Sequence, residues 1–78
     1  MNKERRKRLQ KTIDDLFEVS CVLDRLADDE DEAYDNMPEN LQESERGDFM
    51  LQVADTLREA ASSVENIIDD LETCLETP

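Results

Sequence analysis

The sequence predicts an all-α fold, in which two long antiparallel helices form a helical hairpin and two hairpins pair into a four-helix bundle. Apolar residues recur with a seven-residue period along two long segments, a pattern typical of packed helices and coiled coils. A single internal proline, Pro38, lies between these segments. With one glycine and two prolines, the chain of 78 residues has too few turn-forming residues for an all-β fold. Its length is about half that of a typical domain, so we expect one domain over residues 1–78.

The first helix is expected over residues 9–37, after a basic arm at residues 1–8. If Leu9 is position a of a heptad, the apolar residues fall mainly on positions a, d and e, which adjoin on an α-helix. The a positions are Leu9, Leu16, Leu23, Glu30 and Met37; the d positions are Thr12, Val19, Leu26 and Ala33; the e positions are Ile13, Ser20, Ala27 and Tyr34. Glu30 interrupts the stripe, and we interpret it as a device that sets the register or bends the helix.

Pro38 disfavours helical geometry in the residue before it, so the first helix should end near Met37. Residues 38–44 are then a corner, which has room for one short helical turn with Pro38 in its first position. Ser44 is a suitable N-cap for a second helix over residues 45–76. In that helix all twelve a, d and e positions from residue 50 onward are apolar. They are Met50, Leu57, Val64 and Leu71 at a; Val53, Ala60, Ile67 and Cys74 at d; and Ala54, Ala61, Ile68 and Leu75 at e.

The apolar stripe on each helix is wider than one hairpin needs. A seam between two helices requires only the a and d positions, so a lone hairpin should leave its e positions in water. A two-fold homodimer of hairpins would cover them, whereas a monomer or a hetero-assembly stays open as an alternative. The residues expected in the core of the bundle are Leu16, Leu23, Leu26, Leu57, Val64, Ile67, Ile68 and Leu71.

The charge is strongly negative and unevenly distributed. The 22 acids and nine bases give a net charge of −13, with +5 in residues 1–11 and −18 in residues 12–78. The acids are either a solvated outer face or a surface for a basic partner. A dimer would carry twice −13, close to the roughly 29 phosphates on a 50 Å length of duplex DNA, so mimicry of DNA is a further option. The basic arm is expected to pair with the acids at the far end of the second helix: Asp69, Asp70, Glu72 and Glu76.

Catalytic chemistry is not expected. The absence of histidine removes the usual general base and the commonest metal ligand, and Ser20 is interpreted as a small packing residue rather than a nucleophile. Two pairs, Glu32 with Asp35 and Asp69 with Glu72, have the spacing that helical nucleotide hydrolases use for a metal ion. Because Asp35, Asp69 and Glu72 fall at positions f, f and b, away from the seam, we predict no catalytic residue, metal or cofactor. A metal-dependent nucleotide hydrolase is the least favoured alternative.

No signal peptide or membrane-spanning segment is apparent, which favours the cytoplasm. Cys21 and Cys74 are too few for a disulfide framework, and we expect reduced thiols, although a bridge between them stays open.

The segment Asp31–Gly47, DEAYDNMPENLQESERG, resembles the linker of a family of small acidic proteins from phages and mobile elements of Gram-positive bacteria. In that family an acidic helix runs into a similar corner, and a second amphipathic helix follows. The helices of this chain have fewer glutamates and more valine, isoleucine and cysteine. The resemblance implies a phage or prophage setting, in which small acidic proteins often inhibit host defence or nucleic-acid enzymes. It implies no active residues.

These observations together predict a non-enzymatic, phage-encoded interaction protein in a bacterial cytoplasm, which binds and inhibits a basic host protein, with DNA mimicry as one mechanism. The alternative is a structural, self-assembling bundle. Direct contact with nucleic acid or membrane is not expected. The residues predicted to contact the partner are Asp28, Asp29, Glu30, Asp31, Glu32, Tyr34, Asp35, Glu39, Leu41 and Glu43. Tyr34 and Leu41 would serve as apolar anchors within a polar rim.

Overall fold

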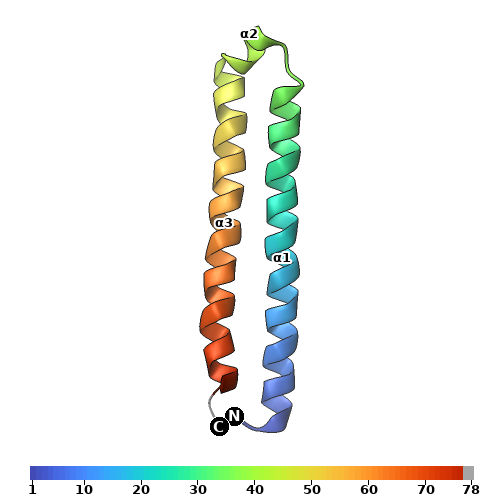
Figure 1. Cartoon of the computed structure of the whole chain (residues 1–78), viewed down its shortest axis with the longest axis vertical. Helices are drawn as coiled ribbons and strands as arrows, with labels where there is room; N and C mark the ends of the chain where they lie inside the picture. The colour runs from blue at the N-terminus through green and yellow to red at the C-terminus, as the bar shows by residue number, and fades with distance from the viewer. Residues whose placement is uncertain (77–78) are drawn as a thin grey trace.

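The computed structural model describes residues 1–76 and shows two long helices packed side by side in opposite directions (Figure 1). Helix α1 spans Lys3–Asp35, the short helix α2 spans Glu39–Gln42 at the corner, and helix α3 spans Glu45–Glu76. The Cα atoms fill a rod of 59 × 14 × 12 Å. The prediction of an all-α helical hairpin is confirmed.

Helix α1 begins at Lys3, so the basic arm forms its first turns instead of preceding it. Asn2 caps the helix, because its side-chain oxygen accepts a hydrogen bond from the backbone N–H of Arg5 at 2.8 Å. The arm reaches the end of α3, where Arg6 Nη1 donates to the backbone carbonyl of Leu75 at 2.7 Å. A cation is favourable there, because the C-terminal end of a helix carries partial negative charge.

The corner is held by main-chain carbonyls. Helix α1 ends at Asp35, and Pro38 is the N-cap of α2 rather than its first residue. The carbonyl of Pro38 accepts hydrogen bonds from the N–H groups of Leu41 and Gln42 at 2.9 and 3.1 Å. Gln42 Nε2 in turn donates to the carbonyl of Tyr34 at 2.9 Å, which ties α2 to the end of α1.

Gly47 makes the close approach of α2 to α3 possible. It lies buried in the first turn of α3, and a Cβ atom built on it would lie 2.6 Å from the carbonyl carbon of Gln42. The backbone of Gln42 could not yield as a flexible side chain would. Glycine at this position is therefore required by packing, not by an unusual backbone conformation, since no glycine in the described chain has a positive φ.

The seam between α1 and α3 differs from the one that the heptad pattern predicts. The buried residues all occupy e positions: Ile13, Ser20, Ala27, Gly47, Ala54, Ala61 and Ile68. The a positions of both helices are half-buried, and the d positions of α1 are exposed. The expectation of an a/d seam with exposed e positions is therefore wrong. Small residues at e on both helices let the two backbones come close together, and the larger a side chains then pack along one edge of the contact.

Ser20 is a packing residue, as expected, because it is 1% exposed and its hydroxyl donates to the carbonyl of Phe17 at 2.7 Å. Of the predicted bundle core, Ile68 is buried in the hairpin. Leu16, Leu23, Leu57, Val64 and Leu71 are half-buried. Leu26 and Ile67 are exposed, because they occupy d positions and point away from the a/e seam.

Candidate interaction surfaces

The two broad sides of the hairpin differ in character. In an antiparallel pair, equivalent heptad positions on the two helices lie on the same side of the seam, and the ion pair between Asp31 and Arg58, both at position b, shows this directly. We call the side formed by positions b and f the acidic face, and the opposite side, formed by positions d and g, the apolar face.

The acidic face holds half of the acids in the chain. They are Asp14, Asp24, Asp28, Asp31, Asp35, Asp48, Asp55, Glu65, Asp69, Glu72 and Glu76, and all are exposed except Asp31, which is half-buried. From residue 9 onward, Arg58 is the only base at these positions. Only three acids of the two helices, Asp15, Asp29 and Asp70, lie at positions d and g. The negative charge is thus concentrated on one side of the rod.

Arg58 bridges the two helices on this face. Its Nη2 atom lies 2.6 Å from Asp31 Oδ2 and 2.9 Å from Asp28 Oδ1. The hydrogen bonds to Asp31 and Asp28 raise the pKa of the guanidinium above its ordinary value, because both carboxylates favour its charged form. The bridge removes part of the local negative charge and leaves the acids on either side of it open to a partner.

The acidic run at residues 28–32 does not form one patch. Successive residues of an α-helix are about 100° apart around its axis. Asp28 and Asp31 therefore lie on the acidic face, Asp29 on the apolar face and Glu32 on the outer edge, whereas Glu30 is half-buried beside the seam. These five residues surround α1 rather than converge on one partner surface.

The remaining predicted contact residues surround the corner. Tyr34 is half-buried, and Asp35, Glu39, Leu41 and Glu43 are exposed. Contact of these residues with a partner stays a prediction.

The acids that share the f position are far apart in the chain, so they do not stand out as a cluster in the sequence. Seven of the nine f positions from residue 14 to residue 76 are acidic; the exceptions are Cys21 and Ser62. Each heptad step moves about 10 Å along the helix, so these acids form two regular rows. The same heptad assignment, applied to the polar positions, predicts both rows.

The charge also varies along the rod. Residues 23–60, the half that contains the corner, carry 13 acids and three bases, a net charge of −10. The other half, with both chain ends, carries nine acids and six bases, a net charge of −3. The molecule is therefore most negative toward the corner.

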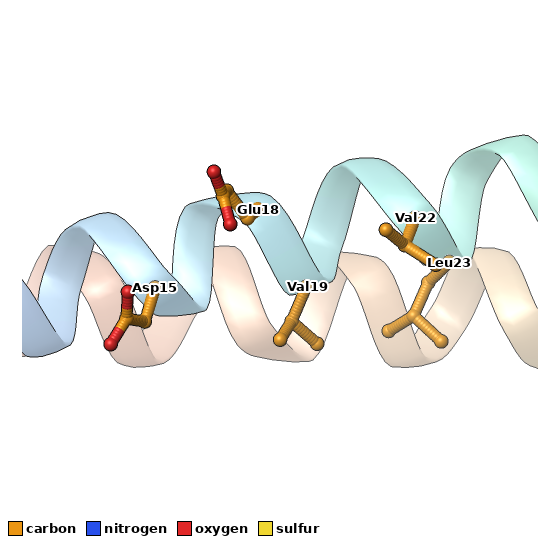
Figure 2. A pocket seen from close by; sticks show the side chains of 5 residues that line it. All are labelled: Asp15, Glu18, Val19, Val22 and Leu23. Carbon is orange, nitrogen blue, oxygen red and sulfur yellow. The ribbon is translucent and has the colours of Figure 1, made fainter.

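The apolar face exposes large side chains on both helices. On α1, Val19, Val22 and Leu26 are 44–46% exposed, and on α3 Phe49 and Ile67 are 64% and 48% exposed. Two shallow grooves of about 380 and 220 Å³ lie on this face. One is lined by Asp15, Glu18, Val19, Val22 and Leu23 of α1, and the other by Phe49, Gln52, Val53, Thr56 and Leu57 of α3. In Figure 2 the side chains of Asp15, Val19 and Leu23 point to the same side of α1, and Glu18 points to the opposite side.

The acids with the spacing of a metal site do not lie in the seam between the helices. Glu32, Asp35, Asp69 and Glu72, which have the spacing of a metal site, are all exposed. Within residues 1–76, no three acidic or cysteine side chains converge as a metal ion would require. Cys21 is a half-buried free thiol, and the free thiol of Cys74 is exposed on the apolar face.

No protein-family model, curated protein or solved structure matches this chain. Neither long helix, over residues 1–76, contains an apolar stretch long enough to cross a membrane.

Proposed function

We propose that the protein is a non-enzymatic, acidic interaction protein whose acidic face binds a basic surface on another protein. The observation that carries this proposal is the collection of eleven acids on one side of the hairpin, ten of them exposed, against a single base from residue 9 onward. A surface that served only for solvation would mix both signs, since pairs of opposite charge four residues apart stabilise a helix. Here that stabilisation is largely absent.

The spacing of the acids suits a basic protein partner. Eleven acids along 59 Å give about one charge per 5 Å, roughly a third of the density of duplex DNA. Such a field speeds the encounter with a positively charged partner and weakens as salt is added. Occupation of a DNA-binding groove is a narrower form of the proposal, which a competition experiment with DNA separates from the general one.

The resemblance of residues 31–47 to phage and mobile-element proteins favours a host enzyme as the partner, in the cytoplasm of a Gram-positive bacterium. Inhibition would follow because an acidic rod that lies in a basic cleft excludes the negatively charged substrate.

We further propose that the working unit is a homodimer, with two hairpins forming a four-helix bundle. The hairpin exposes 5890 Å² of surface, whereas a compact monomer of 9.0 kDa is expected to expose about 4,900 Å². The excess is similar to the roughly 800 Å² that each partner buries in a standard protein interface. A purely structural, self-assembling module is the second candidate function, and the exposed apolar face favours it.

Two variants of equal charge test the proposal. Asp24→Asn/Asp35→Asn/Asp55→Asn removes three charges from the acidic face without touching the Arg58 bridge, and Asp15→Asn/Asp29→Asn/Asp70→Asn removes three from the apolar face. Tagged forms of both and of the wild type would be used to capture proteins from a Gram-positive lysate, with and without duplex DNA.

We expect a basic partner that the first variant loses and the second retains. Release of the partner by DNA would support the groove-binding form. Equal capture by both variants, or capture of nothing by the wild type, would remove the interaction function and leave the structural module.

A further inference from the structure

We infer that the apolar face docks the same face of a second copy of this chain, with the two hairpins antiparallel and their acidic faces outward. This inference deepens the proposed function and rests on its dimer. It identifies the face that is buried, the orientation of the two copies and the surfaces that remain free.

The grooves on the apolar face have the geometry of a helix–helix contact. Four of the residues that line the groove on α1, at positions 15, 18, 19 and 22, are related by steps of three, four and seven residues. The groove on α3 repeats this spacing at positions 49, 52, 53 and 56. Four residues with this spacing form the hole that receives one side chain of a facing helix in knobs-into-holes packing. Both helices present such a hole at the same heptad positions.

The width of the apolar face favours a second hairpin over a single partner helix. Exposed apolar side chains extend out to Val22 on α1 and Phe49 on α3, at the outer g positions of both helices. A single helix is about 10 Å across with its side chains and would leave one of the two rows uncovered. A second copy offers two helices of matching length, and it presents projecting side chains, such as Leu26 and Ile67, to the holes.

The charge distribution favours the apolar face as the contact between the two copies, and it favours their antiparallel orientation. Two chains of net charge −13 repel each other, and the apolar face is the side on which that repulsion is smallest. If the corners lay together, the two halves of charge −10 would be adjacent. The antiparallel arrangement instead sets each −10 half against a −3 half, which lowers the repulsion.

The arrangement predicts specific neighbours across the two-fold axis. The exposed apolar residues of α1 are centred near Val22, so Val22 should lie close to the same residue of the second copy. Val19 of one copy should then face Leu26 of the other. The acidic faces lie on opposite outer sides, so one dimer offers two equivalent sites and should bind two basic partners.

Sedimentation equilibrium from micromolar to millimolar concentration tests the assembly, with an expected mass of twice 9.0 kDa. Leu26→Asp should raise the dimer dissociation constant roughly a hundredfold or more, because each dimer would bury two new carboxylates. Phe17→Asp is the matched control: Phe17 is 59% exposed at position b, on the acidic face, and its replacement should leave the dimer intact. Circular dichroism checks that both variants stay helical.

Cysteine cross-linking tests the orientation in a background that carries Cys21→Ala and Cys74→Ala. A disulfide needs Cα atoms within about 7 Å of each other. Val22→Cys should therefore form a homodimeric disulfide on mild oxidation. Val19→Cys and Leu26→Cys chains should cross-link with each other when mixed, and much less with themselves.

A wild-type chain that stays monomeric at every concentration would overturn the inference, as would a dimer that Phe17→Asp disrupts and Leu26→Asp does not. A dimer with no disulfide at Val22→Cys would overturn the antiparallel orientation. Partner binding is a separate readout, because monomeric Leu26→Asp keeps its acidic face. If it still binds the basic partner while the wild type proves monomeric, the inference fails and the interaction function stands.

Discussion

The clearest quantitative prediction concerns Gly47→Ala. Replacement of a helical glycine by alanine ordinarily stabilises a helix by about 1 kcal/mol. At Gly47 the new methyl group would meet the backbone of Gln42, with the carbonyl carbon at 2.6 Å where ordinary contact begins at 3.4 Å. The carbonyl oxygen of Gln42 would be closer still, so the corner would have to move by more than about 0.8 Å.

Overpacking of this kind costs about 1–3 kcal/mol, and a clash with backbone belongs in the upper part of that range. After subtraction of the propensity gain, we expect a net loss of about 1–2 kcal/mol in the free energy of unfolding. For a domain of this size the loss corresponds to a fall of roughly 5–15 °C in the melting temperature.

Thermal unfolding followed by circular dichroism at fixed protein concentration measures the effect. Ser62→Ala, at an exposed f position of the same helix, is the control and should stabilise the protein by about 0.5 kcal/mol. If Gly47→Ala raised the melting temperature as Ser62→Ala does, Gly47 would not be a packing requirement, and our account of the corner would be refuted.

Three further predictions follow from the seam, the ion pair and the cap. Ala61→Leu should destabilise the hairpin by about 1–3 kcal/mol in chemical denaturation, because Ala61 is 2% exposed in the small-residue seam; Ala33→Leu, at an exposed d position, should not. Arg58→Met should lower the melting temperature more than Arg25→Met does. Both variants change the net charge equally, but Arg25 lies at an outer c position. Equal falls in the melting temperature would show that the bridge does not stabilise the hairpin. Asn2→Ala should cost about 1 kcal/mol locally, seen as roughly fivefold faster amide hydrogen exchange in the first turn of α1 and unchanged exchange in α3.

The sequence was sufficient to predict the hairpin but not its seam. Heptad periodicity and Pro38 identify two helices and the corner between them. Positions d and e are both apolar, however, and they flank position a on either side, so the period alone cannot decide which of them faces the neighbouring helix. The choice depends on matched small residues, such as Ala27 and Ala61, on both helices at once. Such a match can be recognised only when the two helices are considered together, and not from either segment alone.

The acidic surface was located less well, because nearness in the chain is a poor guide to nearness on a helix. The run at residues 28–32 is the densest in the sequence, yet the helical rotation distributes it around α1. Asp14, Asp28 and Asp35 are far apart in the sequence but form one row. The apolar pattern also does not mark the start of α1, because Asn2 caps a first turn made of charged residues.

The C-terminal ends of the two long helices are held in different ways. In the described helices neither last turn has a basic residue of its own. At the end of α3 the missing positive charge is supplied by Arg6 from the other helix. At the end of α1 the hydrogen-bond donor is the neutral side chain of Gln42. The acids Glu32 and Asp35 lie in the last turn of α1, near the negative end of the helix. Most domains fray first at their chain ends. Here the hydrogen bond from Arg6 to Leu75 joins the two helices at that end, so we expect the corner to open before the chain ends.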